Sequence, residues 1–262
     1  MYLLNDIRVQ IIRHIRTLFR IRVWIFISLV QPIIWLVLFT QVFDSLGQSF
    51  AVIPGLEGTS YLQFFAPGVV VMTVLFGSAW AGMGMLQDID MGILSKMLAT
   101  PVTRGSIITS RVLASMVMLV IQALIIFTIS VIMGVDIATG VPGVLFSIVL
   151  ICLLGLGFAA FSNGLALLFR RPEPLMGVIN FIALPTVFMS STMMPGGPDG
   201  FLPGWLDTVR QFNPVDYAVV GVRDLVLSGY IWSDLWRSIL VLAAWATAGI
   251  TFGTLMFRAK AE

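Results

Sequence analysis

Charged and polar residues whose spacing could serve chemistry gather in one short segment, 87–106. Asp88 and Asp90 stand near its start, and Thr100-Pro101 stands near its end. Carboxylates suit the positive N-terminal end of a helix, and a proline disfavours helical backbone at the residue before it. The pattern therefore predicts one short helix between Asp88 and Pro101, on a connection between longer elements.

This predicted helix has an apolar edge made by Ile93, Leu94, Met97 and Leu98. An apolar edge on an exposed connection indicates a docking surface. The alternative is a connector that rests on the chain's own helices, and the pattern by itself leaves both interpretations open.

The motifs of nucleotide binding and of hydrolytic or metal chemistry are absent from the sequence. It contains no GxxxxGKS/T phosphate loop, no HExxH, no GxSxG and no Cys/His cluster. The single histidine, His14, lies in a basic N-terminal segment, and the single cysteine, Cys152, lies in an apolar stretch. We therefore expect no enzymatic activity, no cofactor and no metal on this chain.

The connections that carry these polar residues lie between six long stretches that contain no Asp, Glu, Lys, Arg or His. The stretches cover 23–43, 62–86, 112–134, 143–169, 175–194 and 238–257. Each is long enough for a helix to cross roughly 30 Å of hydrocarbon, and only a helix satisfies its own backbone in lipid. The composition agrees, with 58% hydrophobic and 11% charged residues. We predict an all-α polytopic membrane protein in which residues 1–262 form a single transmembrane domain.

Lys and Arg set the orientation of such a chain. The N-terminal segment, the connections at 87–111 and 170–171, and the C-terminal tail hold 12 of the 15 basic residues. The opposite connections hold only Arg210, Arg223 and Arg237. Both termini are therefore expected in the cytoplasm. Because the basic residues flank the membrane, the net charge of +2 does not indicate a nucleic-acid partner.

Residues 2–22 have the pattern of an amphipathic helix. Arg13, Arg16 and Arg20 lie opposite an apolar face, which is typical of a helix lying in the membrane interface beside anionic headgroups. The alternative is a basic flank of the first span with no further role.

The largest outer connection, 195–235, is unusually apolar. Its segments 201–209 and 215–228 are too short to span separately, so we expect an outer re-entrant helical loop before the last span. The spans themselves carry only uncharged polar groups such as Gln122 and Asn163, which either join helices or line a path. With no ionisable group in the spans, a buried proton relay has nothing to use.

With these residues laid out, the chain resembles the type-2 ABC exporter permeases, especially the daunorubicin-resistance and nodulation-factor exporter branch. The segment from Asp90 to Arg104 resembles that family's coupling segment, although the family usually has Glu where Asp90 stands. The stretch Ser190-Ser191-Thr192 and the outer-loop residues Pro195, Asn213, Pro214, Tyr217 and Arg223 resemble its signature around the fifth span.

The resemblance implies a half-transporter that exports an amphipathic drug, lipid or lipid-linked glycan across the bacterial inner membrane. Two permease chains would pair as a homodimer, and each would seat one copy of a separate ABC ATPase that binds ATP and Mg²⁺. The residues implied in coupling to that ATPase are Asp88, Asp90, Gly92, Leu94, Met97, Leu98, Thr100, Pro101 and Arg104. The alternatives are a secondary carrier, which would need no ATPase, and a non-transporting membrane assembly protein.

Overall fold

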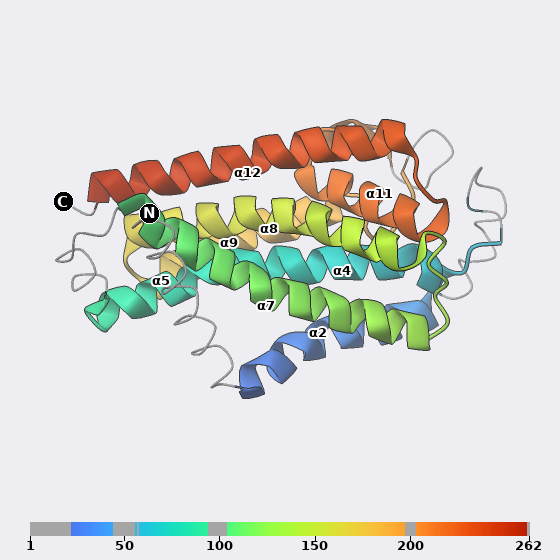
Figure 1. Cartoon of the computed structure of the whole chain (residues 1–262), viewed down its shortest axis with the longest axis horizontal. Helices are drawn as coiled ribbons and strands as arrows, with labels where there is room; N and C mark the ends of the chain where they lie inside the picture. The colour runs from blue at the N-terminus through green and yellow to red at the C-terminus, as the bar shows by residue number, and fades with distance from the viewer. Residues whose placement is uncertain (1–21, 44–55, 57, 94–103, 197–202, 261–262) are drawn as a thin grey trace.

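The computed structural model describes residues 22–43, 56, 58–93, 104–196 and 203–260 of the 262-residue chain. All regular structure in these ranges is helical, and long helices run side by side in one bundle (Figure 1). The helices are α2 (Arg22–Val42), α4 (Tyr61–Ala79), α5 (Ala81–Asp90), α7 (Arg104–Ile132), α8 (Gly140–Phe169), α9 (Pro172–Phe188), α10 (Gly204–Arg210), α11 (Pro214–Leu227) and α12 (Trp232–Lys260).

Four stretches of helix are long and apolar enough to cross a membrane: Tyr61–Asp90, Ser110–Ile132, Gly140–Phe169 and Trp232–Ala259. Two shorter apolar helices, Ile27–Val42 and Pro172–Phe188, lie where the first and fifth spans are expected. These findings confirm a polytopic helical membrane protein, and the count of six spans stays a prediction.

The chain connections fall at two opposite ends of the bundle. The turn between α7 and α8 lies at the same end as α11, and α5 lies at the other end with the start of α7 (Figure 1). We call the α11 end the outer end and the α5 end the inner end, following the orientation predicted from the basic residues. The two short helices α10 and α11 confirm that the connection 195–235 contains helices too short to span separately.

Helix α8 is the centre of the bundle and packs against α12, α4, α5 and α7. Its closest neighbour is α12, because glycines let the two backbones approach. A Cβ atom on Gly249 would lie 2.3 Å from the Gly157 carbonyl oxygen, and one on Gly253 would lie 2.7 Å from the Ala160 carbonyl oxygen. The glycine pair Gly249 and Gly253 therefore lets α12 approach α8 closely.

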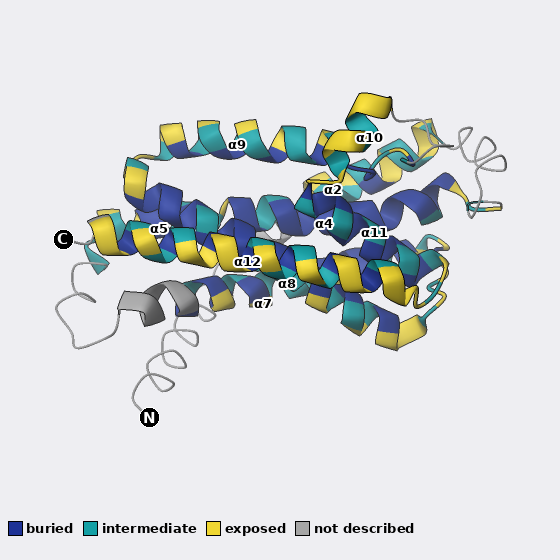
Figure 2. Ribbon diagram, turned by 90° about the horizontal axis from the view of Figure 1, so that it is seen from above, coloured by how far each residue is buried: buried dark blue, intermediate teal, exposed yellow. Residues whose placement is uncertain are grey.

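The outward face of the bundle is apolar, as expected for a surface in contact with lipid. Exposed residues alternate with buried ones along α12 (Figure 2), and its exposed side chains include Trp236, Leu240 and Leu255. Helix α2 exposes Ile27, Ile34 and other large apolar side chains. In water such a surface would be a liability, whereas a bilayer accommodates it.

The structure corrects one sequence prediction. Asp88 and Asp90 do not open a helix but lie in the last turn of α5, which begins at Ala81. Helix α5 continues past residue 86, where the second uncharged stretch ends, and stops at Asp90. A turn then follows at Gly92, whose φ is +63°. The predicted interfacial helix 2–22, with Arg13, Arg16 and Arg20, lies outside the described residues, as do Leu94, Met97, Leu98, Thr100 and Pro101.

Substitution of Gly249 by valine should destabilise the protein, because the side chain would meet the backbone of α8 rather than a movable side chain. We expect a loss of about 1–3 kcal/mol or more, measured as a lower thermal midpoint of the purified protein in detergent. The matched control is Gly177→Val, since a Cβ on that exposed glycine of α9 would have nothing within 4 Å. Equal midpoints for the two variants would contradict the close α8–α12 contact.

Candidate functional site

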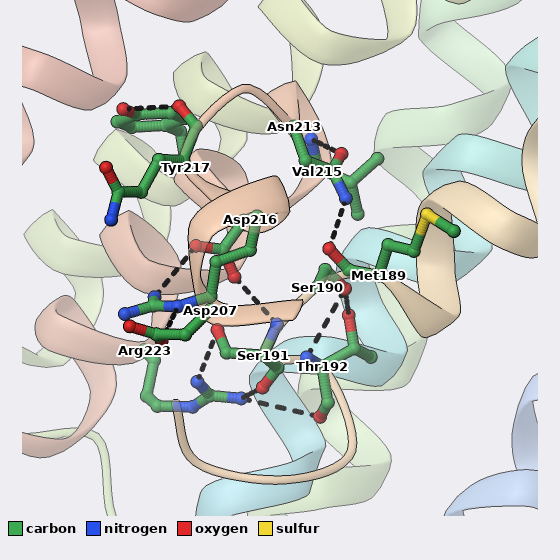
Figure 3. Close-up of polar contacts among 12 residues, drawn as sticks. Met189, Ser190, Ser191, Thr192, Asp207, Asn213, Val215, Asp216, Tyr217 and Arg223 are labelled. Atoms are coloured by element: carbon green, nitrogen blue, oxygen red, sulfur yellow. Dashed lines mark hydrogen bonds and ion pairs between the residues drawn. The ribbon is translucent and has the colours of Figure 1, made fainter. Parts of the chain in front are cut away.

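A buried polar cluster lies at the outer end of the bundle, where α9 ends and α10 and α11 follow (Figure 3). We call it the Arg223 network; its members are Ser191, Thr192, Asp207, Arg210, Asp216 and Arg223. It joins the turn after α9 to α10, α11 and α4, which are far apart in sequence.

Arg223 is the centre of this network and is only 8% exposed. Its Nε donates to the Phe64 carbonyl oxygen at 3.1 Å, and its Nη2 donates to the Ser191 carbonyl oxygen at 2.8 Å. The guanidinium also lies 3.8 Å from the centroid of the Phe64 ring, a favourable cation–π geometry. Burial lowers the Arg223 pKa to about 10, so the side chain stays charged at neutral pH.

Asp216 connects the same turn to α10. One carboxylate oxygen accepts the Ser191 backbone N–H at 2.7 Å, and the other pairs with Arg210 Nη1 at 3.1 Å. Arg210 in turn donates through Nε to Asp207 at 2.5 Å. The charges therefore form an alternating chain, in which each buried ion has a partner of opposite sign or several hydrogen bonds.

The other predicted outer-loop residues also hold this connection together. Asn213 caps α11 by accepting the Val215 N–H at 3.0 Å, and its Nδ2 donates to the carbonyl oxygens of Thr186 and Met189 at the end of α9. Pro214 occupies the first turn of α11, where its missing N–H costs nothing. The Tyr217 hydroxyl donates to the Gln211 carbonyl oxygen at 2.9 Å, and Pro195 is buried in the turn after α9.

Asp224 is a residue that the sequence analysis did not single out. Its Oδ2 is buried and has no hydrogen-bond partner in the described part of the chain. Burial raises the pKa of its carboxyl to about 7; Asp234 adds to this rise and Arg223 opposes it. The signal in the sequence was a charged pair, Arg223-Asp224, inside an otherwise apolar helical segment.

A second polar contact lies at the inner end. Asp88 on α5 forms an ion pair with Arg111 on α7, and Asp88 is only 9% exposed. Asp88 is therefore shielded from water although it stands near the end of an apolar helix, whereas Asp90 is exposed. Arg111 was not among the predicted coupling residues, and Arg104, which was, begins α7.

The break between α4 and α5 is also held by a side chain from another helix. Ser162 on α8 accepts the Gly82 N–H at 3.0 Å and donates to the Ala79 carbonyl oxygen. Gln122 makes a comparable link, since its Nε2 donates to Ser28 Oγ at 2.6 Å and joins α7 to α2. Of the two roles that the sequence leaves open for polar groups in the spans, Gln122 has the one that joins helices. The side chain of Asn163 donates to the Ala159 carbonyl oxygen within α8.

A bundle of long apolar helices with polar links at both ends is the architecture of a polytopic membrane protein. Residues 5–227 match the family described as ABC-2 type transporter, and the chain belongs to that family. The resemblance to type-2 ABC exporter permeases is thereby confirmed, and with it the interpretation of the chain as a transport subunit rather than an enzyme.

Three relatives illustrate the range of similarity. The transport permease ycf38 of Cyanophora paradoxa is 32% identical over 199 residues, which cover 76% of this chain and 66% of that protein. A daunorubicin resistance ABC transporter permease of Streptomyces coeruleorubidus is 25% identical over 87% of this chain and 76% of its own length. A doxorubicin resistance ABC transporter permease of Mycobacterium tuberculosis is 24% identical over 85% of this chain and 75% of its own. The chain thus spans about two thirds to three quarters of these relatives.

Replacing Arg223 by methionine should destabilise the outer end, because backbone carbonyls would lose their donors and Asp216 would lose a nearby positive charge. Removing one member of a buried charge network costs about 3–5 kcal/mol. The measurement is the thermal midpoint in detergent, with Arg237→Met as control, since that side chain is 74% exposed. A similar loss in both variants would mean that the network adds nothing specific.

The Asp224 carboxyl should make stability depend on pH. Between its ordinary pKa of 3.8 and about 7, the folded protein holds a proton that the unfolded chain releases. Raising the pH through this window therefore lowers the free energy of unfolding. Asp224→Asn should be more stable than the parent above pH 7, by about 1 kcal/mol after allowance for partial exposure.

The difference between Asp224→Asn and the parent should shrink towards pH 4, measured as thermal midpoints across the pH range. The control is Asp136→Asn, which changes an exposed carboxylate at the same end of the bundle. Parallel pH profiles for the parent and Asp224→Asn would show that Asp224 does not titrate in this window.

Proposed function

We propose that this chain is the membrane subunit of an ATP-driven exporter that moves an amphipathic drug, lipid or lipid-linked glycan out of the cell. The observation that carries the proposal is the match of residues 5–227 to the ABC-2 type transporter family. The relatives named for daunorubicin and doxorubicin resistance support an amphipathic cargo. The uncharged middle of the long helices suits such a cargo better than a free ion.

The energy source in this proposal is a separate ABC ATPase, present in two copies, that binds ATP and Mg²⁺. The sequence supports this division of labour because it has no phosphate-binding loop of its own. Two copies of the permease would pair in the bacterial inner membrane, with all six apolar helices spanning and both termini in the cytoplasm. The outer helices α10 and α11 would then form the re-entrant loop.

The docking surface in this proposal is the apolar edge of Leu94, Met97 and Leu98. The chain enters that segment from α5 and leaves it into α7, both at the inner end of the bundle (Figure 1). A surface carried by two helix ends can pass movement of the ATPase directly into the bundle.

A proton-driven secondary carrier is the second candidate, and one observation favours it. Asp224 has a buried, unpartnered oxygen and a pKa of about 7, which is the property a proton-coupled site needs. Against it, Asp224 lies on the short helix α11 rather than in any of the long apolar helices.

Vesicle export separates the two candidates. The chain and a co-purified ABC ATPase are reconstituted, and movement of daunorubicin as the probe is followed by fluorescence. We expect export to require ATP and the ATPase, to survive collapse of the proton gradient, and to persist in Asp224→Asn. Transport by the chain alone, driven by a pH gradient and lost in Asp224→Asn, would establish the carrier instead.

The docking surface is tested in the same complex. Leu94→Asp and Leu98→Asp should insert normally but fail to co-purify with the ATPase, because loss of an apolar anchor typically costs about 2 kcal/mol or more of binding. Leu94→Met and Leu98→Met, which keep the apolar surface, are the matched controls. Full ATPase binding by both Asp variants would place the docking surface elsewhere.

A further inference from the structure

The helix α5, at the inner end, is held to its neighbours by a polar contact at each of its ends. It is ten residues long, follows the break at Trp80, and packs mainly against α8. The predicted coupling segment then leads from α5 to α7. Two polar contacts, one at each end of α5, decide how this short helix is held.

The first contact supports the break between α4 and α5. In an uninterrupted helix the Gly82 N–H would bond to a carbonyl four residues earlier, but here it bonds to the Ser162 hydroxyl at 3.0 Å. The same hydroxyl donates to the Ala79 carbonyl oxygen. A side chain inserted into the hydrogen-bond ladder is a recognised cause of helix kinks. A Cβ on Gly82 would lie 2.4 Å from the Ser162 carbonyl oxygen, so the close approach of α5 to α8 at this break needs glycine.

The second contact ties the far end of α5 to α7. The Asp88–Arg111 ion pair joins side chains that are only 13% and 11% exposed. The arginine has room because Gly84, one turn earlier on α5, has no side chain; a Cβ there would lie 2.8 Å from Arg111 Nη2. A pair this buried costs desolvation and contributes little net stability. The role of this ion pair is therefore to position α5 against α7 rather than to stabilise the fold.

We propose that α5 is a lever that pivots at the Ser162-supported break, and that the Asp88–Arg111 ion pair makes α5 and α7 move together when the coupling segment is displaced. Asp88, Arg111 and Ser162 are positioning residues in this proposal, since they would act through the placement of α5 and α7 rather than by contact with the ATPase. This inference rests on the proposed function. Without the ion pair, displacement of the coupling segment would tilt α5 about the break after α4 while α7 keeps its position.

The first test removes the tie without leaving a buried charge unpaired. Asp88→Asn and Arg111→Gln each remove one ion of the buried pair and should lower the thermal midpoint, whereas the double variant Asp88→Asn/Arg111→Gln should recover most of that loss. All are assembled with the ABC ATPase in nanodiscs. We expect the double variant to co-purify with the ATPase, but the permease-dependent stimulation of ATP hydrolysis should fall about five-fold or more, within the usual range of allosteric coupling.

The matched control is Asp234→Asn/Arg237→Gln, which neutralises an exposed ion pair at the outer end and should leave the stimulation unchanged. A stable double variant at Asp88 and Arg111 with full stimulation would overturn the proposal and make the pair purely structural. Absence of any stimulation by the parent chain would instead be a failure of the proposed function.

The second test needs no change to the ion pair. Spin labels are placed in pairs at three exposed positions: Met91, which directly follows α5, Leu113 on α7 and Leu168 on α8. The background is Cys152→Ala. With nucleotide bound, the distances from Met91 and from Leu113 to Leu168 should both change, while the distance between Met91 and Leu113 should not. A changed Met91–Leu113 distance, or no change in any distance, would overturn the proposal.

Discussion

The absence of water around the bundle is the constraint on which the rest of this structure depends. Every backbone group that a helix does not satisfy, and every charge, must find a partner within the protein. The helix middles meet this requirement by having no charges and by bonding their backbone largely within the helix. Helix ends and breaks leave backbone groups over, and two of these places are met by a side chain from elsewhere in the chain. Ser162 does so at the break after Ala79, and Asn213 does so at the end of α9.

The same constraint explains why the described part of the outer connection is held by many polar contacts. The turn after α9 presents carbonyl oxygens at Ser191 and Thr192, and a single guanidinium reaches both and that of Phe64. Arginine suits this position because its planar fork carries several donors and it keeps its charge when buried. Asp216 then holds the turn from the other side through the Ser191 N–H. The short helix α11 is fixed against α4 and α9 by these contacts as well as by apolar packing. The ion pair between Arg210 and Asp216 in turn ties α10 to α11.

The two ends of the bundle differ in what their polar contacts do. At the outer end many hydrogen bonds converge on one buried cluster, which favours a rigid cap. At the inner end the polar contacts among the described residues are fewer, and they join a short helix to longer ones, as Asp88 joins Arg111. A bundle that is rigid at one end and linked by single contacts at the other can pass movement from the inner end along its long helices. Gly249 lies so close to Gly157 that α8 and α12 pack backbone to backbone.

The sequence by itself determined the class of this protein, because uncharged stretches and basic flanks follow local rules that lipid imposes on any helix. It also pointed to Arg223, Asn213 and Tyr217, although only through resemblance to a family. Local rules failed where a contact joins residues far apart in the chain. Asp88 suited the start of a helix, but α5 begins earlier and Arg111, 23 residues on, neutralises it. Nothing in the local pattern singled out Asp224, whose carboxyl is partly buried because α11 packs against α4, α8 and α12. Only the tertiary structure decides such cases, since burial and pairing depend on which helices meet, and no local pattern records that.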